Sequence, residues 1–130
     1  MYISPEQLAK SGTEHGHQCA IFAWAAQNYD KYPQLRLMFA IPNGGYRNAA
    51  TAGRLKAEGV KSGVADIFLP YPKKYVHGLF IELKVGTNKP TKEQHEFISD
   101  MERFGYTAMW VIGWESARDE IIRYIENKFN

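Results

Sequence analysis

The chain has 130 residues, of which 45% are hydrophobic and 14% aromatic, which is enough to bury one core but not two. Its net charge of +2 says little alone about partners, and its single cysteine, Cys19, excludes an internal disulfide. The first residues lack a signal peptide pattern, and the longest apolar run, CAIFAWAA, has eight residues, short of the ~18 that span a bilayer. We therefore expect one soluble domain over residues 1–130.

The hydrophobic pattern predicts that helices and strands alternate along the chain. Thr13 is a favourable N-cap for a first helix, which we expect to run to about Tyr29. The apolar run LRLMFAI predicts a strand over 35–41, and PNGG predicts a turn over 42–45. The Ala-rich stretch that follows is expected to be helical over 47–58.

The second half of the chain is predicted to contain two strands, a helix, a further strand and a C-terminal helix. These elements are expected at 63–70, 78–86, 92–104, 106–114 and from Ser116 onward. The complete order, α-β-α-β-β-α-β-α, predicts an α/β fold in which helices flank both faces of a mixed central sheet.

One predicted strand, GLFIELKVG, carries two charges in its middle. Alternation places Glu82 and Lys84 on the same face as Phe80. The simplest hairpin register pairs residues whose numbers sum to 148, so that Phe68 faces Phe80 and Asp66 faces Glu82. Facing Cβ atoms lie about 4.5–5.5 Å apart, so these two carboxylates would repel each other unless positive charge lies between them.

Two sources of positive charge fit this pair of carboxylates. Lys84 supplies a single charge, whereas a hard divalent cation such as Mg²⁺ or Mn²⁺ satisfies both carboxylates and accepts oxygen ligands. The alternative is that Glu82 and Lys84 form an ion pair on an exposed outer face, since Glu-x-Lys is a common tripeptide.

Basic residues are concentrated in the middle of the chain. Between Arg47 and Lys92 there are nine Lys or Arg and three acidic residues, which indicates either a phosphate-facing surface or solvated loops. Asn43, Gly44 and Gly45 form a tight turn or, with Arg47, approach a substrate backbone. The other candidate phosphate contacts are Arg54, Lys56, Lys61, Lys73 and Lys74.

A histidine-rich segment near the start superficially suggests a transition-metal site. His15, His17 and Cys19 are spaced two residues apart on a predicted helix. Side chains at that spacing point in divergent directions, so we do not expect a zinc site.

Asp66, followed after fifteen residues by Glu82-Leu83-Lys84, resembles the PD-(D/E)xK nuclease signature. Further segments resemble, in the same order, the virus-type replication-repair nuclease (VRR-NUC) domain. One departure is Ala65, where the family usually has a Pro that shapes the strand and binds no metal. The matching segments are TEHGHQCAIFAWAA, FAIPNGGYRN, GRLKAEGVKSGVADIFLP, HGLFIELKVG, TKEQHEF and GYTAMWVIGWESA.

The resemblance implies a restriction-endonuclease-like core and a set of site residues. Asp66, Glu82 and the backbone carbonyl of Leu83 would hold Mg²⁺ or Mn²⁺, with Glu14 as an outer acidic member. Lys84 would position or deprotonate the attacking water and stabilise charge on the phosphate.

Two glutamines are further candidates for the same site. Gln18 lies one helical turn after Glu14, where it either reaches the site or is solvated. Gln94 completes a capping box in TKEQ, although the family places a Gln beside the active site at this position.

The resemblance also implies a function. Stand-alone domains of this type come from bacteria and phages, so a cytoplasmic, homodimeric Holliday junction resolvase that cuts DNA is expected, without membrane contact. Two alternatives stay open: a less selective nuclease for DNA degradation or defence, and a non-catalytic DNA-binding module.

Overall fold

The computed structural model describes residues 3–42 and 48–127, and these form a four-stranded sheet with helices around it. The elements in chain order are α1 (Pro5–Ala9), α2 (Glu14–Gln27), the 3₁₀ helix η1 (Pro33–Leu37), β1 (Phe39–Ala40), α3 (Ala49–Ala57), β2 (Ile67–Leu69), β3 (Leu79–Lys84), α4 (Lys92–Arg103), β4 (Thr107–Ile112) and α5 (Trp114–Glu126).

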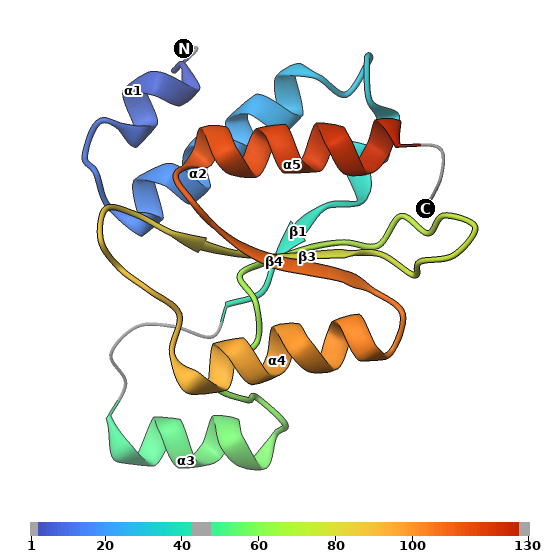
Figure 1. Cartoon of the computed structure of the whole chain (residues 1–130). Helices are drawn as coiled ribbons and strands as arrows, with labels where there is room; N and C mark the ends of the chain where they lie inside the picture. The colour runs from blue at the N-terminus through green and yellow to red at the C-terminus, as the bar shows by residue number, and fades with distance from the viewer. Residues whose placement is uncertain (1–2, 43–47, 128–130) are drawn as a thin grey trace.

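The sheet has the strand order β1-β2-β3-β4. β1, β2 and β3 are antiparallel neighbours, whereas β3 and β4 are parallel. Helices α2 and α5 lie on one side of the sheet and α4 lies on the other (Figure 1). The predicted α/β fold with a mixed sheet and helices on both faces is therefore confirmed.

The hairpin between β2 and β3 has the predicted register. Ile67 pairs with Ile81, Phe68 with Phe80 and Leu69 with Leu79. The Phe68 and Phe80 rings stack with their centroids 4.2 Å apart, a contact that stabilises facing strands. This register determines which side chains meet where the hairpin ends.

Strand β3 is buried on both faces, because all six of its residues are buried. On one face, Ile81 and Leu83 join the apolar core that α2 and α5 cover. On the other face, Phe80 packs with Ala108 and with Phe97 of α4. A central strand with two covered faces must pair or hydrogen-bond any charged residue that it carries.

Four features differ from the sequence-based expectation. The strand predicted over 63–70 is extended only at Ile67–Leu69. The stretch predicted as a strand over 35–41 is mostly the 3₁₀ helix η1, which begins at Pro33, and only Phe39 and Ala40 are extended. Helix α5 begins at Trp114 rather than at Ser116. Helix α1 was not expected, although Ser4 and Gln7 form a capping box there.

Helix α3 is largely exposed, since none of its residues is buried and only Leu55 is half-buried. It lies beyond α4, away from the sheet (Figure 1). Its first turn is capped by Asn48, whose side chain accepts from the amide of Thr51 at 2.8 Å. No helix among the described residues has the length and apolarity needed to cross a membrane.

Candidate active site

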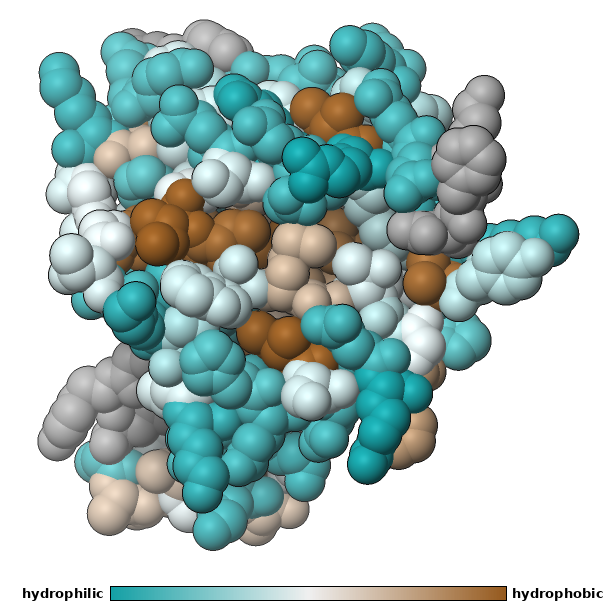
Figure 2. All heavy atoms as spheres, viewed as in Figure 1, coloured by the Kyte–Doolittle hydropathy of each residue, from teal (hydrophilic) through white to brown (hydrophobic). Residues whose placement is uncertain are grey.

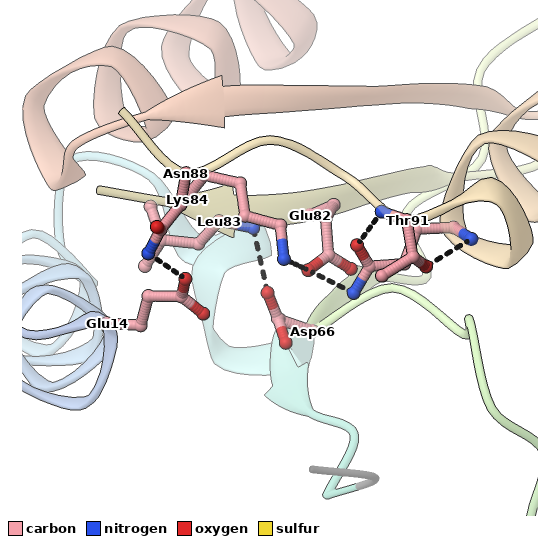
Figure 3. A network of polar contacts seen from close by, with 8 residues as sticks. Glu14, Asp66, Glu82, Leu83, Lys84, Asn88 and Thr91 are labelled. Carbon is pink, nitrogen blue, oxygen red and sulfur yellow. Dashed lines mark hydrogen bonds and ion pairs between the residues drawn. The ribbon is translucent and has the colours of Figure 1, made fainter. Parts of the chain in front are cut away.

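Asp66 lies one residue before β2, where the pairing with β3 ends. Its Oδ2 accepts a hydrogen bond from the backbone amide of Leu83 at 2.8 Å, and its backbone carbonyl accepts from the amide of Ile41 at 2.7 Å. The Asp66 side chain thus accepts from an amide of β3 that, in a longer antiparallel pairing, would donate to a backbone carbonyl of the neighbouring strand. These bonds hold Asp66 beside the C-terminal end of β3 (Figure 3).

Glu82 and Lys84 are buried on the same face of β3. Glu82 is 1% exposed and Lys84 is 8% exposed, and their Oε2 and Nζ atoms are 3.4 Å apart. The alternative of an ion pair on an exposed outer face is therefore wrong. Burying both charges carries a desolvation cost that an exposed pair would avoid, so their place in the core indicates a role beyond solubility.

Burial keeps the Glu82 carboxyl from ionising readily. The pKa of Glu82 is raised to about 8, chiefly by burial and further by the nearby carboxylate of Asp66, whereas Lys84 opposes the rise. Its Oε1 atom is buried and has no hydrogen-bond partner. Orphaned buried oxygens of this kind are uncommon in folded proteins and often mark a site for an ion or water.

Gln94 orients Glu82 and caps helix α4 with the same side chain. Its Oε1 accepts from the amide of Thr91 at 2.8 Å, while its Nε2 donates to Oε2 of Glu82 at 3.1 Å. The capping bond fixes which end of the amide faces Glu82, because only the oxygen can accept from Thr91. Gln94 thus caps α4 and also contacts Glu82, the two roles that the sequence left open.

Glu14 approaches the same end of β3 from the first turn of α2. Its Oε2 accepts from Nδ2 of Asn88 at 3.3 Å, and in the view of Figure 3 Asp66 lies between Glu14 and Glu82. Gln18, one turn further along α2, is half-buried. The structure therefore brings Glu14 to the site region on a different element from the other acidic residues.

The acidic residues of this region fit an oxygen-coordinated divalent cation. Asp66 and Glu82 repel each other, Glu82 has an unpartnered buried oxygen, and carboxylate oxygens are the donors that Mg²⁺ and Mn²⁺ prefer. Within residues 3–42 and 48–127, no three His, Cys, Asp or Glu side chains already converge on one ion. The described residues thus offer two adjacent carboxylates, with Glu14 further out.

The histidine-rich segment forms no metal cluster among the described residues. His15 contacts Cys19, with Nε2 and Sγ 3.6 Å apart, whereas Nδ1 of His17 accepts from the backbone amide of Trp114 at 3.0 Å. His15 and Cys19, one helical turn apart, thus lie on the same side of α2, whereas His17 points toward the start of α5.

Sequence reasoning missed Asn88 and the contact of His17. Asn88 follows β3 in a polar stretch, GTNKP, which reads as an ordinary loop. The sequence does indicate that α5 needs an outside acceptor. Its N-cap, Gly113, has no side chain to accept from the first-turn amides, so another residue must do so. Nothing in the sequence specifies which residue supplies that acceptor.

Lys73, a candidate phosphate contact, binds groups of the protein itself. Lys73 Nζ donates to the backbone carbonyls of Tyr124 and Asn127 at the end of α5, and it lies over the Tyr124 ring at 4.0 Å. Burial lowers the pKa of Lys73. We therefore exclude Lys73 as a substrate contact, and assign it to the C-terminal end of α5, where a cation is favourable.

The other basic candidates remain available on the surface. Arg54, Lys56 and Lys61 are exposed, and Arg54 is 3.6 Å from Glu58 in a solvent-exposed pair that contributes little to stability. Asn43, Gly44, Gly45 and Arg47 lie outside the described residues.

No family model matches the chain, and no curated protein matches it either. A solved structure described as a "VRR_NUC domain protein" does match, with a TM-score of 0.75 and 27% sequence identity over 88% of each chain. The chain is therefore similar in fold and in sequence to a VRR-NUC domain, and this similarity supports a nuclease-type domain.

Proposed function

We propose that the chain is a divalent-metal-dependent, structure-selective DNA endonuclease that acts as a homodimer on four-way junctions. The proposal goes beyond the VRR-NUC assignment in three respects: metal dependence, the branched substrate and the dimer.

The buried Glu82 is the observation that carries the proposal. A carboxylate that is 1% exposed, with one oxygen unpartnered and Asp66 nearby, is costly to the fold. That cost has little structural return, because replacing a buried ion pair by apolar residues of similar volume is often neutral or stabilising. A bound cation compensates it, since the two carboxylates then have a shared counter-charge.

In this proposal the ion is held by Asp66, Glu82 and the backbone carbonyl of Leu83. When bound there, it supplies an acidified water and charge compensation at the phosphate. Lys84 holds the attacking water by hydrogen bonding and places positive charge beside the phosphate. Gln94 keeps Glu82 oriented, and Glu14 forms the outer acidic edge of the site.

The first experiment measures cleavage of a labelled panel in Mg²⁺ or Mn²⁺: a four-way junction, a flap, a plain duplex and a single strand. Lys84→Ala protein is the control for contaminating nuclease. We expect paired symmetric nicks confined to the junction. Equal cutting of all substrates would replace the resolvase by a degradative nuclease, and no metal-dependent cutting would overturn the proposed activity.

The edge strand β4 supports the dimer. It ends the sheet, and the stretch 106–114 contains no charged residue. An apolar band crosses this side of the molecule between α5 and α4 (Figure 2), and Ile112 on β4 is 48% exposed. A long, uncharged edge strand favours association with another chain, and a twofold axis would present two copies of the site to a symmetric junction.

A pair of matched variants tests this interface. Ile112 on β4 and Phe39 on β1 are both 48% exposed and lie on opposite edges of the sheet. We expect Ile112→Lys to yield monomers by light scattering and to abolish paired nicking, while Phe39→Lys leaves the dimer intact. A dimer that survives Ile112→Lys would exclude the β4 edge as the interface.

A further inference from the structure

We propose that His17 and Asn88 are positioning residues, which together hold Glu14 of α2 in place relative to Lys84 of β3. His17 acts through the start of α5, and Asn88 acts through the loop after β3. This inference rests on the proposed function, because it assigns both residues to the geometry of that site.

The first connection runs from Lys84 through the start of α5. The backbone carbonyl of Lys84 accepts from the amide of Gly113 at 2.8 Å, and the next amide, that of Trp114, donates to Nδ1 of His17 at 3.0 Å. Gly113 has a φ of 87°, a backbone conformation that favours glycine. His17 therefore contacts a segment that is itself bonded to Lys84.

His17 replaces the missing N-cap of α5. The N-cap position is Gly113, which has no side chain to accept from the free amides of the first turn. Because a backbone amide can only donate, Nδ1 of His17 must be unprotonated, and a neutral ring carries its proton on Nε2. Trp114 is 3% exposed, so the bond anchors α2 to a buried part of α5.

The second connection runs from Lys84 through the following loop. The amide of Asn88 donates to the carbonyl of Val85 at 3.1 Å, which folds the loop back on itself. The Asn88 side chain then donates to Oε2 of Glu14 at 3.3 Å, as Figure 3 shows. Asn88 is exposed, so burial of its side chain does not account for this contact with Glu14.

The two connections close a ring around the end of the site. It passes from Lys84 to Asn88, to Glu14, along one turn of α2 to His17, and back through Gly113. Apolar contacts between α2 and α5 hold the helices together but tolerate small rotations, whereas hydrogen bonds are directional. The ring therefore fixes the direction in which Glu14 points.

The first test compares near-isosteric replacements of His17. His17→Asn keeps an acceptor at the position of Nδ1, whereas His17→Leu removes it. We expect His17→Leu to lower the kcat for junction cleavage about 10-fold at unchanged KM, with His17→Asn restoring activity to within about 3-fold. The matched control is His15→Leu, a change at an exposed residue of the same helix. Equal activity of the Leu and Asn variants would overturn the assignment of His17.

The second test is a double-mutant cycle between Asn88 and Glu14. Asn88→Leu removes the donor at an exposed position, so its melting temperature is expected to stay within about 2 °C of wild type. We expect a several-fold loss of kcat in the wild-type background and no further loss when Glu14→Gln is already present. Additive losses would show that Asn88 does not act through Glu14.

These tests separate failure of the inference from failure of the proposed function. If Lys84→Ala abolishes cleavage but the Glu14, His17 and Asn88 variants do not alter it, the endonuclease stands and the ring is overturned as a positioning device. If the wild-type protein does not cleave at all, ¹⁵N NMR of His17 still tests the geometry. A ring protonated on Nε2 supports the contact with Trp114, and one protonated on Nδ1 excludes it.

Discussion

The two faces of strand β3 have been assembled under different constraints. One face presents only aliphatic side chains to the core beneath α2 and α5: Leu79, Ile81 and Leu83. The opposite face begins with Phe80 in an apolar cluster and continues with Glu82 and Lys84, which are as well buried as their neighbours. In this strand, therefore, the degree of burial does not distinguish residues of the candidate site from residues of the apolar core.

Polar partners make the difference between the faces. The charged half of the face meets the first turn of α4, where Gln94 reaches Glu82, and the edge where Asp66 takes an amide of β3. The aliphatic face packs against the main apolar core. The aliphatic face therefore stabilises the fold, while the charged face reduces stability in exchange for a site, and substitutions on the two faces should separate these effects.

The largest effect is expected for Asp66→Asn, which keeps an oxygen for the Leu83 amide but removes the negative charge. We expect cleavage to fall at least about 10²-fold, because a site that relies on this charge loses its hold on the cation. The variant should unfold at or above the wild-type temperature, since Asp66 raises the pKa of Glu82 by repulsion. Asp100→Asn on the exposed side of α4 is the control, and unchanged cleavage by Asp66→Asn would remove Asp66 from the site.

Leu83→Ala tests the opposite face of the same strand. Leu83 is completely buried in the main core, and truncating such a side chain costs about 2–5 kcal/mol of unfolding free energy. Its amide and carbonyl are backbone groups, so cleavage per folded molecule should stay within about 3-fold of wild type. Denaturant titration measures the first quantity and cleavage at low temperature the second. A fully folded but inactive variant would show that the faces are not independent.

Glu82→Gln gives a smaller effect on stability, which depends on pH. Without metal, the folded pKa of about 8 lies above the ordinary value of 4.5, so between these values the folded state binds a proton that the unfolded state lacks. Stability contributed by this group is thus present at low pH and lost as the pH rises toward 8. Glutamine removes the loss, and we expect the stability of the variant relative to wild type to grow by about 3–4 kcal/mol between pH 5 and pH 8 in a chelator. Parallel stability curves for the two proteins between pH 5 and 8 would contradict this expectation.

The hairpin and its charged residues could be predicted from sequence because their signals are local. Alternation in GLFIELKVG and a seven-residue connection specify a register, and the structure confirms the pairs at Phe68 and Ile67. The segment 35–41 was misread because an apolar run suits a strand and a short 3₁₀ helix equally well. There Leu35 is 1% exposed and Leu37 is 49% exposed, a contrast that depends on tertiary packing.

The contacts that form the ring around Lys84 could not be predicted from the sequence, for a different reason. Its contacts join residues 74 and 97 positions apart, Asn88 with Glu14 and Trp114 with His17. Histidine and asparagine occur widely on surfaces, so neither residue carries a pattern by itself. Only the three-dimensional arrangement of α2 against α5 and the loop after β3 reveals their pairing.

Because the Gln94 amide both caps α4 and contacts Glu82, fewer residue types can replace glutamine at that position. A capping box accepts glutamate as readily as glutamine, so helix α4 alone would let the two residues exchange by neutral drift. A glutamate, however, would bring a third carboxylate against the buried Glu82 and would lack the donor that now contacts it. Descendants of this chain that retain the site should therefore keep glutamine where helix chemistry permits both, and a consensus design that ranks only helix stability would miss this restriction.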